Sequence, residues 1–107
     1  MDRIAFLQDF IKSNPHDLFS RHALAMEWIK NGEDANAKAI FEDILLIDPS
    51  YVGSYYHLGK LMERLEAFQD AIKIYQQGMA EAENQKDHHA LRELKAAFNQ
   101  LQDELEY

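Results

Sequence analysis

The feature that most constrains this chain is an internal repeat with a period of 34 residues. The segment that begins at residue 14 can be aligned with the segment that begins at residue 48 without a gap. At this single offset six pairs agree in type: Pro15 with Pro49, Leu24 with Leu58, Ala25 with Gly59, Trp28 with Met62, Ala37 with Ala71 and Phe41 with Tyr75. Such self-similarity predicts two copies of one supersecondary unit, which bury their apolar faces by stacking.

The composition favours helices throughout. The chain of 107 residues is 47% hydrophobic, with only four Gly and two Pro and no Thr. Residues before proline avoid helical angles, so breaks are expected at Pro15 and Pro49. Gly32 marks the expected turn of the first hairpin, where a left-handed residue commonly ends a helix. The equivalent residue in the second copy is Glu66, whose side chain disfavours positive φ, so we expect that turn to adjust or to be slightly strained. We predict an all-α fold of about six helices, at residues 2–12, 17–31, 34–47, 51–64, 67–84 and 87–105.

Gly59 lies inside one of these predicted helices, although glycine there costs roughly 1 kcal/mol relative to alanine. We expect it to mark the closest crossing of two helices, opposite Ala71, as Ala25 does in the first copy. Leucine at position 59 would then destabilise the fold by about 1–3 kcal/mol, whereas alanine would be nearly neutral or mildly stabilising. The residues expected in the core are Trp28, Phe41, Tyr55, Met62, Leu65 and Tyr75.

Composition and charge argue against several classes of protein. The formal net charge is −8, and an excess of acid opposes the phosphate attraction that dominates nucleic-acid binding. Without cysteine there are neither disulfides nor thiolate metal sites. The first fifteen residues mix charged and apolar positions, unlike a signal peptide, and no apolar run approaches the roughly 20 residues that cross a bilayer. We expect a soluble, cytoplasmic protein that binds neither nucleic acid nor membrane.

The 34-residue unit resembles the tetratricopeptide repeat (TPR) family. That family places an aromatic or aliphatic residue, a Leu, two small residues, an aromatic and a closing Pro at fixed positions. The second copy has Tyr55, Leu58, Gly59, Ala71, Tyr75 and Glu83 there, and the first has Arg21, Leu24, Ala25, Ala37, Phe41 and Pro49. Arg21 and Glu83 depart from the pattern. Arg21 suggests a loosely covered helix, and Glu83 suggests a helix that runs on past the usual stop.

The resemblance implies antiparallel helix–turn–helix hairpins stacked as a short right-handed solenoid. We expect a single domain with an N-terminal capping helix at 2–13, repeats at 15–48 and 49–84, and a C-terminal capping helix at 87–106. In the C-terminal helix Lys95 stands where Gly59 stands in the second copy, which suits a helix with nothing packed outside it.

The histidines and carboxylates do not form a recognisable catalytic motif. His88 and His89 are adjacent, so on a helix they point about 100° apart and form no chelating pair. Glu42 and Asp43 are expected on a solvated helix face. There is no HExxH motif, no Ser-His-Asp or Cys-His grouping and no glycine-rich phosphate loop. We therefore expect neither an enzyme nor a cofactor or metal site.

The resemblance also implies a concave groove lined by the first helix of each repeat. The residues that it assigns to this groove are Phe19, His22, Met26, Lys30, Tyr56, Lys60, Arg64 and Arg92. Four of the eleven basic residues fall in this set, which favours an acidic or carboxylate-bearing peptide as partner. The alternative is that Lys60 and Arg64 solvate their helix and pair with nearby acids. The carboxylate clamp of chaperone-binding members is absent, because His22, Met26 and His57 occupy its first three positions.

Two hypotheses for function follow. The leading one is a non-catalytic scaffold that binds a protein or peptide in this groove. The alternative is a self-associating structural module or a subunit of a larger complex, with a homo-oligomer formed through the C-terminal helix. The residues expected to dock on a second chain in that case are Phe98, Leu101, Leu105 and Tyr107.

Overall fold

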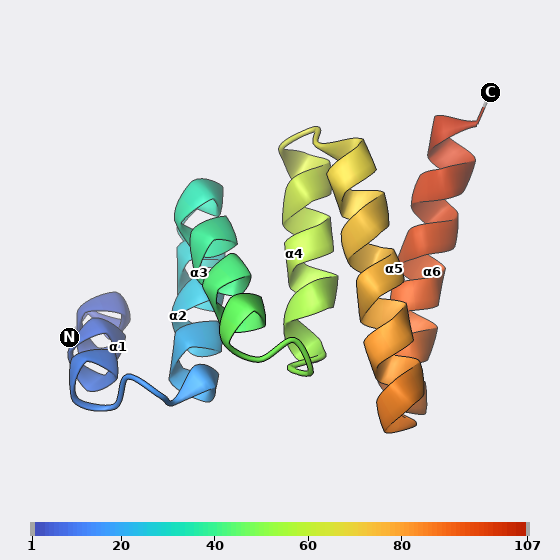
Figure 1. Ribbon diagram of the computed structural model, residues 1–107. Helices are drawn as coiled ribbons and strands as arrows, with labels where there is room; N and C mark the ends of the chain where they lie inside the picture. The colour runs from blue at the N-terminus through green and yellow to red at the C-terminus, as the bar shows by residue number, and fades with distance from the viewer. Residues whose placement is uncertain (1, 107) are drawn as a thin grey trace. The chain divides into compact units, whose positions relative to one another are not determined.

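The computed structural model describes residues 2–106, and all of its regular elements are helices. They are α1 (Arg3–Ser13), α2 (Leu18–Lys30), α3 (Asp34–Ile47), α4 (Gly53–Arg64), α5 (Phe68–Gln85) and α6 (His88–Leu105) (Figure 1). The predicted all-α fold is confirmed, and each helix begins and ends within two residues of its expected bounds. Among the described residues no helix is both long and apolar enough to span a bilayer.

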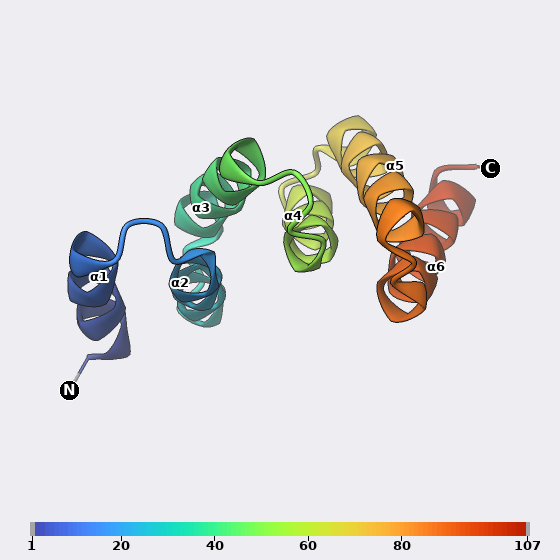
Figure 2. The same cartoon turned by 60° about the horizontal axis from the view of Figure 1, so that its bottom comes forward.

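Contacts divide the chain into two compact units, which we describe separately. In the N-terminal unit, residues 1–47, α1 packs against α2, and α2 forms a hairpin with α3. In the C-terminal unit, residues 48–107, α4 forms a hairpin with α5, and α5 packs against α6. Figure 2 shows α4 and α6 on either side of α5. The division falls beside Pro49, between the two predicted repeats, and the single-domain organisation stays a prediction.

Each unit has an apolar centre built from the helical stripes seen in the sequence. In the N-terminal unit Ile4, Leu7 and Leu24 form a buried cluster, and Trp28 is partly buried against it. Four of the six residues expected in the core are buried: Phe41, Tyr55, Met62 and Tyr75. The expectation for Leu65 is wrong, because its side chain is 45% exposed. Leu65 is the residue after the last turn of α4, where the helical periodicity ends.

Each hairpin contains an equivalent hydrogen bond, although the residue that donates it differs between the two. In the second repeat the Tyr55 hydroxyl donates to the Pro49 carbonyl oxygen over 2.6 Å. In the first repeat Arg21, at the equivalent position, donates from Nη2 to the Pro15 carbonyl oxygen over 2.9 Å. Both bonds tie the first helix of a hairpin to the loop before it. Arg21 is half-buried. Its hydrogen bond is a polar contact that holds α2 at the position where the sequence suggested a loosely covered helix.

The turns inside the hairpins also match. Gly32 has φ 76°, which confirms the left-handed cap expected there. Glu66 does not adjust away from this conformation, because it has φ 60°. In each turn the next residue donates its backbone N–H to a carbonyl in the last turn of the helix. Glu33 donates to Trp28 over 2.9 Å, and Ala67 donates to Met62 over 2.8 Å. This pattern is a Schellman cap, which satisfies carbonyl groups that the helix end leaves unpaired.

The atoms nearest to Gly59 across the hairpin belong to the ring of Tyr75. A Cβ atom at position 59 would lie 2.2 Å from Cε1 and 2.6 Å from Cζ of Tyr75, which is itself fully buried. Gly78, on the next helix, makes a similar close approach, since its Cβ would lie 2.6 Å from Cβ of Tyr55. The expectation that alanine is tolerated at position 59 is therefore wrong, because the space that its methyl group needs is already filled.

We predict that Gly59→Ala destabilises the protein, by up to about 2 kcal/mol. Overpacking costs about 1–3 kcal/mol, and the gain in helix propensity of about 1 kcal/mol offsets only part of that cost. The control is Gly53→Ala at the start of α4, where an added Cβ would meet nothing within 4 Å. That substitution is expected to be neutral or stabilising by up to about 1 kcal/mol. Urea unfolding of both variants measures the difference, and equal midpoints would contradict the packing argument.

Candidate functional site

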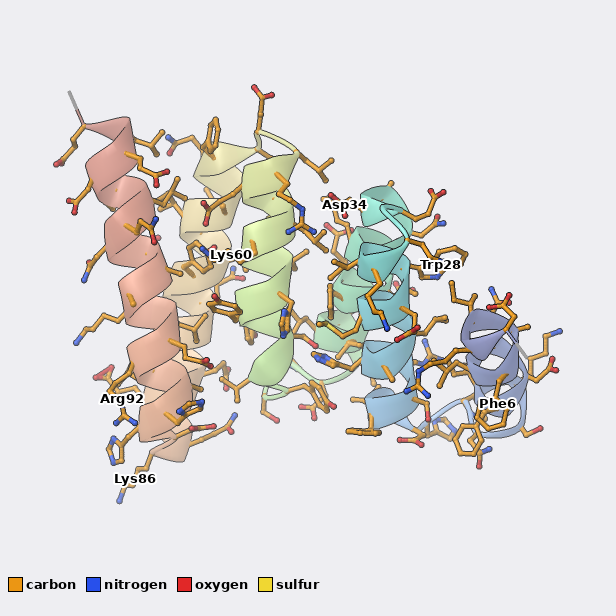
Figure 3. All side chains as sticks on the ribbon, turned by 180° about the vertical axis from the view of Figure 1, so that it is seen from behind. Phe6, Trp28, Asp34, Lys60, Lys86 and Arg92 are labelled. Carbon is orange, nitrogen blue, oxygen red and sulfur yellow. The ribbon has the colours of Figure 1, made fainter. Side chains whose placement is uncertain are left out.

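The residues assigned to the groove are divided between the two units. Phe19, His22, Met26 and Lys30 lie on α2, whereas Tyr56, Lys60 and Arg64 lie on α4 and Arg92 lies on α6. Figure 3 labels Lys60 halfway along α4 and Arg92 near the beginning of α6. Each unit therefore carries its own set of candidate binding residues.

On α2 the set mixes packed and exposed side chains. His22 is half-buried and meets the ring of Phe41 edge-on, with 5.3 Å between ring centroids, so it belongs partly to the hairpin core. Phe19 is 73% exposed, which is unusual for a phenylalanine within a helix. Lys30 Nζ lies 3.6 Å from Oε2 of Glu27 on the same helix. Phe19 and Lys30 are the side chains of this set that extend furthest into solvent.

On α4 a cluster of side chains forms around Glu63. The Tyr75 hydroxyl, which reaches across from α5, donates to Oε2 of Glu63. Lys60 Nζ lies 3.9 Å from the same oxygen and 5.8 Å from the centroid of the Tyr56 ring. Burial, followed by the hydrogen bond and the negative charge of Glu63, raises the pKa of Tyr75 well above its usual value of 10.0. The cluster gives Tyr56 and Lys60 a defined arrangement on the surface.

This cluster contains a contact that the repeat pattern does not predict. The family position requires only an aromatic residue at 75, and the first copy has Phe41 there. The hydroxyl of Tyr75 adds a polar group that reaches the edge of the core and holds Glu63. One difference between the two copies in the sequence goes with this contact. The second copy has Tyr75 and Gly59 at the positions where the first copy has Phe41 and Ala25.

His57 lies beside this cluster and is half-buried. Its ring meets the ring of Tyr56 edge-on, with 5.4 Å between centroids. Burial lowers the pKa of His57 below its usual value, and the charge of Glu93 on α6 partly offsets that shift. His57 is thus held as a packing residue next to Tyr56.

Acidic neighbours offset more of the positive charge in the two candidate sets than the sequence suggested. Lys30 has Glu27 beside it, and Lys60 has Glu63 beside it. These are pairs within one helix at a spacing of three residues. The Lys60–Glu63 pair agrees with the alternative that Lys60 pairs with a nearby acid. Arg92 is exposed near the start of α6. The acidic neighbours lower the positive potential of both sets of residues, without removing the charges from the surface.

A depression in the surface and a histidine beside a carboxylate bear on whether the chain holds a ligand or a metal ion. One shallow depression of about 460 Å³ lies between α1 and α2, lined by Ala5, Gln8, Asp9, Ile11, Lys12 and Leu24. His89 Nε2 lies 3.5 Å from Oε1 of Glu93, one turn along α6. Within residues 2–106, no group of three or more His, Asp or Glu side chains is placed to hold a metal ion.

The C-terminal helix presents a smaller apolar surface than the self-association hypothesis expects. Leu101 is buried within the C-terminal unit and Phe98 is half-buried, so Leu105 is the exposed one of the three named residues that the structure describes. Tyr107 lies outside the described residues. Lys95 is exposed, as expected for a helix with nothing packed outside it.

Paired helices that are joined by matching turns and repeat at 34 residues define a helical-hairpin repeat protein. A tetratricopeptide repeat domain protein from Salinibacter ruber, solved by crystallography, is 44% identical to this chain with a TM-score of 0.80. That match covers 85% of this chain and 100% of the other. The solution NMR structure of a Salinibacter ruber TPR domain protein is also 44% identical, with a TM-score of 0.81, and the match covers 87% and 93%. The chain belongs to the tetratricopeptide repeat family.

More distant structures share the fold alone. The TPR2B domain of yeast Sti1, solved as a complex with pHsp70, has a TM-score of 0.86 at 15% identity. That match covers 94% of this chain and 81% of the other. No family model matches the sequence, and no curated protein matches it.

The raised pKa of Tyr75 gives a prediction for alkaline pH. Below pH 10 the hydroxyl is protonated in both the folded and the unfolded chain. Above pH 10 the unfolded chain loses this proton and the folded chain keeps it, so stability falls as pH rises, by up to about 1.4 kcal/mol per pH unit. The difference in unfolding free energy between wild type and Tyr75→Phe is therefore expected to be constant from pH 7 to 9 and to shrink by pH 11. Urea unfolding across this range measures it, and an unchanged difference at pH 11 would contradict the assignment.

Proposed function

We propose that this chain is a non-catalytic protein-interaction module that binds a peptide or protein surface through the first helix of each repeat. The observation that carries the proposal is the arrangement on α4, where Lys60 lies beside Glu63 and over the ring of Tyr56, and Glu63 accepts a hydrogen bond from Tyr75. An ordered aromatic side chain beside a positive charge loses little conformational entropy on binding. Aromatic and basic residues are also the types that most often dominate binding energy at interfaces.

Membership of the TPR family supports this function, because stacked helical hairpins offer extended surfaces for partners. The yeast Sti1 domain with the same fold is described as a complex with pHsp70. For this chain we propose the broader function of peptide or protein binding, without that partner.

We further propose that the partner carries acidic groups. Lys30 and Lys60 pair with acids on their own helices over 3.6 and 3.9 Å, and such partly exposed pairs contribute only about 0–1 kcal/mol. A carboxylate from a partner can therefore join these lysines at little cost. The charges steer the encounter, while apolar contacts with Phe19 and Tyr56 supply the affinity.

We predict that Tyr56→Ala combined with Lys60→Ala abolishes capture of partners from extracts of the native cell by the immobilised protein. The substitutions remove the aromatic anchor and the charge that it holds. The matched control is Lys73→Ala with Gln76→Ala, two exposed side chains on α5 that belong to neither candidate set. Circular dichroism checks that both variants stay folded. Co-eluting proteins are identified by mass spectrometry, and capture that survives the first variant would rule out the α4 surface.

A further inference from the structure

The helix α1 presents three different faces, and one of them is apolar and exposed. Ile4, Leu7 and Ile11 face α2 and form its contact with the core. Residues 5, 8, 9 and 12 line the shallow depression on a second side. Arg3, Phe6 and Phe10 recur at i, i+3 and i+7 and so share a third face. Phe6 and Phe10 are 49% and 38% exposed on it, and Figure 3 labels Phe6.

The helix α2 carries a matching face on the same side of the N-terminal unit. Phe19, Glu27 and Lys30 lie at i, i+8 and i+11, which also places them on one face of a helix. An ion pair joins the two faces, because Arg3 Nε on α1 lies 3.4 Å from Oε2 of Glu27 on α2. We call this surface the N-terminal aromatic face and define it by Arg3, Phe6, Phe10, Phe19, Glu27 and Lys30.

We propose that the N-terminal aromatic face binds a short peptide segment in which apolar residues flank an acidic side chain. The three phenylalanines would contact the apolar residues of this peptide. Arg3 and Lys30 would bind its carboxylate. The proposal deepens the proposed function, since Phe19 and Lys30 belong to both sites, but it adds a surface on α1 that the groove assignment does not contain.

The charges on this face favour an acidic partner. Arg3 and Lys30 share a single carboxylate, that of Glu27, so the cluster keeps one net positive charge on a protein of net charge −8. The Arg3 and Lys30 side chains are 61% and 71% exposed, whereas that of Glu27 is 18% exposed. Both cations thus remain accessible, while the acid that pairs with them is largely covered. A second carboxylate from a partner would complete the pairing.

The apolar area favours a short segment over a second copy of the chain. A phenylalanine that becomes fully buried covers about 150–250 Å². At the observed exposures the three rings together offer roughly 300 Å². A stable protein dimer typically buries about 800 Å² on each partner. Two copies, each of net charge −8, would also repel one another. A peptide needs only a patch of this size.

The test selects ligands without assuming their sequence. A displayed library of random 12-residue peptides is panned against the full chain, and enriched peptides are synthesised and measured by fluorescence anisotropy. We expect enriched peptides to combine two apolar residues with Asp or Glu. Their affinity should fall at least ten-fold for Phe6→Ser with Phe10→Ser, and at least three-fold for Arg3→Gln. It should also weaken as salt is raised.

The controls separate this surface from other exposed apolar residues. Leu65→Ser with Leu105→Ser changes two exposed leucines in the C-terminal unit, and binding should be unchanged. Phe6 and Phe10 lie outside the buried cluster, so their variants should keep the helical circular dichroism of the wild type. Phe19→Ser is a second variant of the same face, on α2, and should also weaken binding at least three-fold.

Each outcome decides the proposal. Failure to enrich any peptide, enrichment of basic peptides, or full binding by Phe6→Ser with Phe10→Ser would overturn it. Light scattering that finds a wild-type dimer dissociated by those substitutions would overturn it too, because a second copy would then be the occupant. If peptides need Tyr56 and Lys60 but not Phe6 and Phe10, the proposed function stands and the N-terminal aromatic face fails. Peptides that need neither pair count against both.

Discussion

The contact between Gly59 and the ring of Tyr75 is the constraint on which the C-terminal unit depends. It brings α4 and α5 together at a distance that no side chain at position 59 would allow. The same contact places the hydroxyl of Tyr75 at the edge of the core, where it donates to Glu63. Glu63 in turn lies beside Lys60, which lies over Tyr56. A packing requirement inside the hairpin therefore positions the charged and aromatic side chains outside it.

Much of the fold could be predicted from the sequence because its period is set by the backbone. Turns and caps need particular φ values and spacings, so Glu66 adopts the left-handed conformation of Gly32 despite its side chain. Arg21 replaces an aromatic residue, yet it donates to the loop carbonyl as Tyr55 does. The repeat conserves the geometry of the contact more strictly than the chemistry of the residue. A pattern of residue types alone therefore does not predict this contact of Arg21.

Contacts between helices were harder to predict, because they depend on side-chain direction. The expected partner of Gly59 across the helix crossing was Ala71, but the ring whose atoms lie nearest comes from one turn further along α5, at Tyr75. Leu65 fits the apolar spacing of α4 but lies just past its end and is exposed. For the candidate site, the repeat positions gave the helix that carries each residue. They did not give the acidic neighbours of Lys30 and Lys60, since ion pairs depend on rotamers that no spacing specifies.

The helices α1 and α6 differ in how they meet solvent, and the difference bears on function. In α6 Lys95 is exposed, whereas the apolar side chain of Leu101 is buried. In α1 the apolar side chains of Phe6 and Phe10 lie partly exposed on the face that carries Arg3. Solubility alone would favour polar side chains at both positions. Exposed apolar surface next to a positive charge is the combination expected of a surface that binds a partner.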